Sequence, residues 1–222
     1  MGEFNNRELR LLLVKESNYD LTKAEKLYNF IVGEQPEEPC VEESKSDGIY
    51  FILSRDNMIH ESVATDEDKR NSIAIGVKMG DRFANVTLHD TANGNMVALC
   101  KNSKIPCGSI QFFRGTFFEA ITDWDGEANT NDIRKALNPD ICLCKDVYIP
   151  TVAQLYLILL NINKINKALV EAGGDPMEKG WYWSSTEYNG DSAWCVSFVH
   201  GGAYNYNKAD YYVVRPSVAC EI

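Results

Sequence analysis

Apolar residues near the start of the chain recur every three to four positions, as they do on one face of a helix. The segments RELRLLLVKE and LTKAEKLYNFIV, both within residues 6–32, show this pattern and predict two amphipathic helices. Asp20 suits the cap of the second helix, and Gly33 suits its end. Because such short helices are marginal in water alone, we expect residues 1–33 to pack on the remaining chain or, by preference, on a second copy.

The hydrophobic pattern then changes twice. Residues 34–47, EQPEEPCVEESKSD, are acidic, contain two prolines and carry few large apolar groups, which is typical of a linker. From residue 48 onward, short apolar or alternating runs such as GIYFIL, SIAIGVKM, ANVTLHD, MVALC and SIQFF are separated by Gly, Asn and Asp. These runs predict strands joined by tight turns. We therefore expect a helical segment at 1–33, a linker at 34–47 and a domain at 48–222.

Helical spacing returns in the middle of this domain. NTNDIRKAL predicts a short helix, and IPTVAQLYLILLNINKINKALVEAGG predicts a longer helical segment. Thr151 suits the N-terminal cap, and Gly173 suits the stop. A break is expected at Asn161 or Asn163. Short strands with a few central helices predict the α+β class and not a doubly wound parallel sheet.

Four segments between residues 148 and 216 occur in an order typical of one family: YIPTVAQLYLI, INKALVEAGG, YWSSTEYNGDSAWCVSF and NKADYYVVRP. In this order they resemble a C-type-lectin-like domain of bacterial and phage proteins that is related to formylglycine-generating enzymes. Within that group, the chain is most similar to the variable proteins of diversity-generating retroelements in gut bacteria and phages. The resemblance covers residues 48–216, and WDGEANT fits the family's turn before the helices. It implies a C-type-lectin-like fold of short, twisted antiparallel strands with two or more helices.

Large side chains in these segments are expected to form a fixed framework. Trp183, Trp194 and Phe198 can anchor adjacent strands through buried aromatic area. Arg215 can place its guanidinium on a carboxylate or on carbonyls, and Glu187 is the partner that we expect.

Residues 188–212 have a different composition from this framework. They are rich in Tyr, Asn, Gly, Ser and Asp and contain no Glu, Gln, Leu, Ile, Met, Arg, Thr or Pro. Among them only Trp194 and Lys208 require codons that end in a purine. The resemblance implies variable sites that arise by mutation of adenines in Asn-type codons, and that process would leave this residue alphabet. An ordinary loop rich in Gly and Tyr is the alternative.

The same composition suits recognition, because Tyr provides rigid amphipathic contact while Ser, Gly and Asn provide adaptable hydrogen bonds. Alternation in WCVSFVHG predicts that Trp194, Val196 and Phe198 point inward while Cys195, Ser197 and Val199 point outward. The predicted ligand-binding residues are Tyr188, Asn189, Asp191, Ser192, Cys195, Ser197, Val199, His200, Ala203, Tyr204, Tyr206, Asp210 and Tyr211.

Catalytic and metal-binding interpretations receive less support from the sequence. Cys195 and His200 are five residues apart and fall on opposite faces of a strand, which disfavours a Cys–His pair, and no matching redox-active cysteine pair is present. Asp123, Asp125 and Glu127 carry oxygens that suit calcium, but the glycine between them is misplaced for an EF-hand, so a structured turn is favoured. The seven cysteines lack paired CxxC spacing, and reduced, mostly buried thiols are expected instead of a zinc site. We therefore expect no enzyme activity, no metal and no cofactor.

The net charge of −10 limits the partners further. Nucleic-acid backbones and anionic membrane surfaces both attract clustered Lys and Arg, which are missing. No apolar run is long enough to span a membrane, and the N-terminus lacks the basic start of a signal peptide. We expect synthesis in the cytoplasm, and packaging into a virion is one route by which the protein could leave the cell. The expected partner is a protein or cell-surface ligand. The alternatives are a phage virion structural or decoration protein and, less favoured, a formylglycine-generating-type enzyme.

Overall fold

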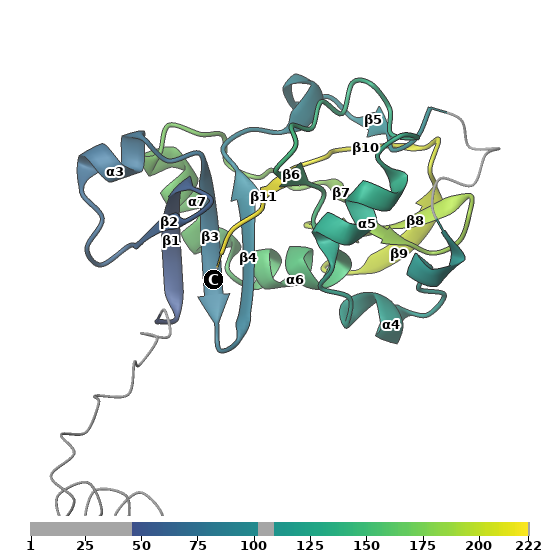
Figure 1. Cartoon of the computed structure of the whole chain (residues 1–222), viewed down its shortest axis with the longest axis horizontal. Coiled ribbons are helices and arrows are strands. Elements are labelled where there is room, and N and C mark those ends of the chain that lie inside the picture. The colour runs from purple at the N-terminus through teal and green to yellow at the C-terminus, as the bar shows by residue number, and fades with distance from the viewer. Residues whose placement is uncertain (1–45, 102–108, 222) are drawn as a thin grey trace, which may run out of the picture. The chain divides into compact units, whose positions relative to one another are not determined.

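The computed structural model describes residues 46–101 and 109–221. The predicted helical segment 1–33 and residues 34–45 of the predicted linker lie outside these ranges, so their interpretation stays a prediction. Within the described residues, the chain combines short antiparallel strands with helices (Figure 1), which confirms the predicted α+β class. Across the same ranges, no helix has the length and apolar character needed to cross a membrane.

The first part of the domain is a four-stranded antiparallel sheet with the order β2-β1-β3-β4. Alternation in β1 divides its side chains between two cores: Ile49 and Phe51 pack toward the helices, while Tyr50 and Ile52 pack on the other face. The strands of this sheet are β1 (Gly48–Ser54), β2 (Asn57–His60), β3 (Ala74–Met79) and β4 (Arg82–Thr87), with the short helix α3 (Asp66–Arg70) between β2 and β3.

Two consecutive helices, α6 (Val152–Leu160) and α7 (Ile162–Glu171), contact this sheet. The predicted boundaries are confirmed. The Thr151 side chain accepts a hydrogen bond from the backbone N–H of Gln154 and completes a capping box. Asn161 lies at the break between the helices, where its side chain donates to the carbonyl of Leu157 at 3.0 Å. Gly173 follows α7 with a φ of 78°, which a residue with a side chain rarely adopts.

A second sheet, with the order β7-β8-β9, lies on the other side of α6 (Figure 1). Its strands are β7 (Trp181–Glu187), β8 (Ser192–Ser197) and β9 (Ala203–Asn207). Two short antiparallel pairs, β10–β5 and β11–β6, connect the C-terminal residues to earlier segments. The remaining elements are β5 (Val97–Ala98), β6 (Val147–Tyr148), β10 (Tyr211–Tyr212), β11 (Ser217–Val218), α4 (Phe117–Ile121), α5 (Gly126–Ile133), and the 3-10 turns η1 (Thr91–Gly94) and η2 (Ile110–Phe112).

The acidic segment before α5 is a turn only as far as Asp125, because the helix already begins at Gly126. The short helix predicted in NTNDIRKAL therefore starts earlier than its sequence pattern indicates. Asp123 is buried and accepts hydrogen bonds from the Asn129 side chain at 2.7 Å and from the Thr186 hydroxyl at 3.1 Å. Its carboxylate thus joins α5 to β7.

The expected partner of Arg215 is wrong. The buried Arg215 guanidinium pairs with Asp90 and donates to the carbonyls of Leu88 at 2.8 Å and Asp175 at 3.1 Å. Glu187 instead pairs with Lys208. Arg215 therefore joins the end of the chain to the segment after β4 and not to the C-terminal sheet.

The expectation of reduced, mostly buried thiols is also wrong in part. Cys142 and Cys144 are free but exposed, whereas the free thiol of Cys195 is buried. Cys100 is disulfide-bonded. Among the cysteines that the structure describes, Cys195 is therefore the one that fits the predicted state fully.

Candidate functional site

Aromatic side chains lie beside the buried core on one face of the C-terminal sheet. Residues paired across antiparallel strands point to the same face. The register pairs Trp183 with Cys195 in β7–β8, and it pairs Cys195 with Tyr204 and Ala193 with Tyr206 in β8–β9. Trp181 lies two residues before Trp183 and so shares this face.

The rings on this face contact one another. Ring centroids are 5.7 Å apart for Trp181 and Tyr204, and 5.4 Å apart for Trp181 and Tyr206. Tyr212, from β10, lies 5.0 Å from Tyr206 and 5.1 Å from Trp183. We call Trp181, Tyr204, Tyr206 and Tyr212 the aromatic face. Trp181, Tyr206 and Tyr212 are half-buried, and Tyr204 is 58% exposed.

A rigid buried layer supports these rings. Trp183 is fully buried, and its indole N–H donates to the carbonyl of Val97 at 2.9 Å. It belongs to a core cluster with Ile133 of α5 and Cys195 of β8, against which Trp181, Tyr206 and Tyr212 pack. The four predicted framework side chains, Trp183, Trp194, Phe198 and Arg215, are all buried. The aromatic face therefore rests on groups with little freedom to move.

The predicted outward orientation of Cys195 is wrong. Cys195 does point away from Trp194, as alternation requires, but it points into the core cluster of Trp183 and Ile133 and is fully buried. β8 is covered on both sides, because Trp194 and Val196 pack in the core that includes α6 while Ala193 and Cys195 pack in the core that includes α5. When a strand is buried on both faces, neither face is exposed to solvent, so alternation does not predict which side chains are accessible.

Ser197 is a second correction, since it too is fully buried. Its hydroxyl oxygen accepts hydrogen bonds from the backbone N–H groups of Val199 at 3.3 Å and His200 at 3.2 Å. Its backbone N–H donates to the carbonyl of Gly202 at 2.8 Å. Ser197 therefore shapes the turn between β8 and β9 and does not face a ligand.

A buried ion pair holds the turn between β7 and β8. The Lys208 ammonium, fully buried just after β9, pairs with the buried Glu187 carboxylate. It also donates to the carbonyls of Asn189 at 3.0 Å and Gly190 at 2.9 Å. Burial raises the pKa of Glu187, and the adjacent Lys208 opposes that shift. The pair fixes an exposed turn from beneath.

The remaining predicted residues fall into three places. Tyr204 and Tyr206 lie on the aromatic face. Tyr188 and Ala203 lie on the opposite face, where Tyr188 contacts Trp194 at a ring distance of 5.7 Å. The turns and strand ends hold Asn189, Asp191, Ser192, Val199, His200, Asp210 and Tyr211, which are exposed except for the half-buried Ser192. The predicted set therefore does not share a single surface.

The sequence prediction missed Trp181 and Tyr212. Trp181 is two residues from the framework Trp183, so strand alternation could have placed it on the same face. Tyr212 carries no such signal, because its place depends on β10 pairing with β5, which is distant in sequence.

Local electrostatics favour neutral groups on this face. Burial, aided by Cys195, Tyr206 and Asp210, raises the pKa of Tyr212 to about 12. Burial likewise raises the pKa of the Cys195 thiol well above its ordinary value, so this thiol is not an activated nucleophile. In the described part of the chain, His, Cys, Asp and Glu side chains form no group of three or more that could hold a metal ion. The surface offers aromatic area and hydrogen bonds.

No protein-family model matches the chain, and no curated protein matches it either. Among solved structures, it is similar to a fimbrial protein from Bacteroides ovatus ATCC 8483. The two align with a TM-score of 0.52 and 15% sequence identity over 78% of this chain. The match covers 48% of the fimbrial protein, so this chain spans about half of its length. At this identity, the likeness concerns the fold alone.

Proposed function

We propose that this chain is a non-enzymatic binding protein that uses a C-type-lectin-like scaffold to present a recognition surface on its C-terminal sheet. The aromatic face carries the proposal, because it combines exposed and half-buried rings with a fully buried supporting layer. Contiguous apolar surface that stays accessible to solvent marks interaction sites. Preformed tyrosine and tryptophan contacts also lose little conformational entropy on binding.

The recognition surface in this proposal differs from the one that the sequence predicts. It consists of the aromatic face and the exposed Tyr211, bordered by polar groups at the sheet ends such as Asn189, Asp191 and Asp210. Cys195 and Ser197 belong to the scaffold. The ligand is a protein or cell-surface molecule that complements rings and hydrogen-bonding groups.

The binding proposal is tested with full-length protein and arrays of bacterial surface glycans and surface proteins. The test variant replaces Tyr204, Tyr206 and Tyr211 with Ser. A matched control replaces three exposed apolar residues elsewhere: Val63, Phe118 and Val170. We expect the wild type and the control to bind the same array members and the tyrosine variant to lose them. Equal binding by both variants, with both folded, would show that the aromatic face is not the recognition surface.

Diversification of residues 188–212 is a separate part of the proposal. It predicts pyrimidines in the third codon positions of the variable residues, a near-copy of this coding region that differs at adenines, and a neighbouring reverse transcriptase gene. Sequencing the genomic region tests all three. Third-position purines at the variable codons contradict diversification without affecting the binding proposal.

A second candidate function is that of a structural subunit in a virion or a fibre. The solved fimbrial protein with a similar fold favours it, as does β9, which lies at a sheet edge and whose sequence AYNYN contains no Lys, Pro or charge that would discourage strand pairing. Under this alternative, the aromatic face is buried between copies. Light scattering coupled to gel filtration separates the two functions, because assembly predicts a mass that rises with concentration and falls in the tyrosine variant.

A further inference from the structure

A groove distinct from the aromatic face lies where the β3–β4 hairpin, α4 and α6 meet. Its volume of about 450 Å³ is within the range of small-molecule sites. None of its lining residues belongs to the aromatic face. The lining consists of Met79, Arg82, Phe117, Ile121, Trp124, Ala153, Tyr156, Leu157 and Leu160.

Several apolar side chains that line the groove are exposed to solvent. Met79 and Phe117 are each 47% exposed, and Leu160 is 78% exposed. Covering such surface is favourable because it removes apolar area from water. The Tyr156 hydroxyl already donates to the carbonyl of Gly201 at 3.0 Å, so its hydrogen-bond donor does not need a polar ligand. The main body of the groove therefore suits an apolar occupant.

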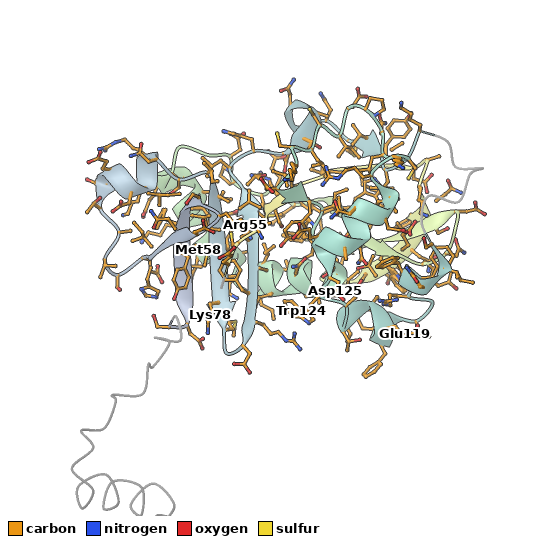
Figure 2. The ribbon with its side chains drawn as sticks, in the orientation of Figure 1. Arg55, Met58, Lys78, Glu119, Trp124 and Asp125 are labelled. Carbon is orange, nitrogen blue, oxygen red and sulfur yellow. The ribbon has the colours of Figure 1, made fainter. Side chains whose placement is uncertain are left out.

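Of the lining residues within 46–101 and 109–221, Arg82 is the one that carries a charge. Its guanidinium carbon lies 4.8 Å from the centre of the Trp124 ring, and none of the ion pairs in the described ranges includes Arg82. In Figure 2, Trp124 lies between Lys78 of the first sheet and Glu119 of α4. Stacking engages the plane of a guanidinium and leaves its N–H edges available for two parallel bonds to a carboxylate.

Among the described residues that line the groove, none is acidic, so none of them competes for this cation. Glu119 of α4 is engaged within its own capping box, where its Oε2 accepts hydrogen bonds from the backbone N–H and the hydroxyl of Thr116. The chain has a net charge of −10, which repels anions in general. A cation without an ion-pair partner beside apolar surface therefore makes this groove selective among ligands. It favours an anionic head over a neutral or cationic one.

We propose that this groove binds an amphiphilic carboxylate, with the carboxylate at Arg82 and a linear apolar chain between Phe117 and Leu160. The site is independent of the recognition surface on the C-terminal sheet. Decanoate is a suitable probe, and decan-1-ol provides the same chain without the charge. Calorimetric titration of the full-length protein, below the concentration at which the probes aggregate, measures both affinities.

Two variants test the two halves of the site. Arg82→Gln removes the cation and is expected to weaken decanoate about tenfold, while leaving decan-1-ol unchanged. Leu160→Glu places a carboxylate at the exposed rim and is expected to weaken decanoate by a similar factor. Val170→Glu is the matched control: it makes the same change at an exposed position outside the groove and should leave both affinities unchanged.

Three results would overturn the proposal. The first is the absence of saturable decanoate binding to the wild-type protein. The second is equal affinity for decanoate and decan-1-ol, which would mark an apolar surface without anion selectivity, such as a contact for a partner protein. The third is unchanged decanoate binding in both Arg82→Gln and Leu160→Glu, since circular dichroism can verify that these exposed substitutions leave the fold intact.

Discussion

Lys208 and Glu187 form an ion pair in the interior of the domain, where neither side chain has appreciable contact with solvent. The pair joins the end of β9 to the end of β7, and the same ammonium binds two carbonyls of the intervening turn. It therefore ties the exposed tips of the C-terminal sheet to the framework beneath them.

Removing one partner of this pair is expected to be costly. Lys208→Met leaves a buried carboxylate without its cation and should lower the free energy of unfolding by about 3–5 kcal/mol at pH 7. Because burial raises the pKa of Glu187, its neutral form is favoured in the fold, and the variant should recover stability as the pH falls and Glu187 binds a proton. Urea unfolding at pH 5 and pH 7 measures both effects.

Two control variants test whether the cost of Lys208→Met comes from the unpaired buried charge. The double variant Lys208→Met with Glu187→Leu should recover most of the loss, because neither buried charge remains. Lys167→Met, in an exposed pair with Glu171, should cost less than about 0.5 kcal/mol. If Lys208→Met costs no more than Lys167→Met, the buried pair does not hold the sheet.

The aromatic face and its support should respond differently to substitution. Trp183→Ala removes a fully buried anchor and should cost about 3–5 kcal/mol. Tyr211→Ser, at a side chain that is 65% exposed, should change stability by less than about 0.5 kcal/mol. Chemical unfolding of the two variants measures the difference. Comparable losses would contradict the separation of a fixed buried layer from an exposed surface that tolerates substitution.

Thiol labelling should distinguish the cysteines by position. At pH 8, we expect iodoacetamide to modify the exposed Cys142 and Cys144 in the native protein, and to modify Cys195 only after denaturant is added. The physical reason is burial, which excludes the reagent and raises the pKa of the Cys195 thiol. Peptide mass spectrometry assigns each site. Rapid labelling of Cys195 in the native protein would contradict its burial and favour the outward orientation that its sequence pattern predicts.

Tyr148 should make the domain sensitive to alkaline pH. Burial raises the pKa of Tyr148 from its ordinary value near 10 to about 12. The fold thus favours the neutral phenol, and the resulting stability is fully present below pH 10 and lost as the pH rises through 12. The loss between pH 10 and 12 is expected to be roughly 2 kcal/mol.

Comparing the wild type with Tyr148→Phe isolates this effect. The variant loses the hydroxyl that accepts a hydrogen bond from Gln154 at 3.2 Å, so it is expected to be less stable at neutral pH but to have a shallower decline above pH 10. Unfolding free energies measured from pH 9 to pH 12 test this expectation. Parallel pH profiles for the two proteins would mean that Tyr148 ionises as it does in the unfolded chain.

Local rules were sufficient where the signal and the structure involve neighbouring residues. The Thr151 cap, the break at Asn161 and the stop at Gly173 each depend on backbone groups within a few positions, and all three predictions are confirmed. The partner of Arg215 depends instead on which distant loop the end of the chain reaches. The sequence predicted Glu187 as the carboxylate that pairs with Arg215. In the fold, Arg215 pairs with Asp90 and Glu187 pairs with Lys208.

By itself, the sequence determined the α+β class, the helices α6 and α7 with their ends, and the residues bulky enough to anchor the C-terminal strands. Only the tertiary structure decided which small residues between those anchors reach solvent. Alternation separates the two faces of a strand, but it does not say what covers each face. Because helices and other segments cover both faces of β8, Cys195 and Ser197 are buried. The side chains that remain accessible on this sheet are instead rings from β7, β9 and β10.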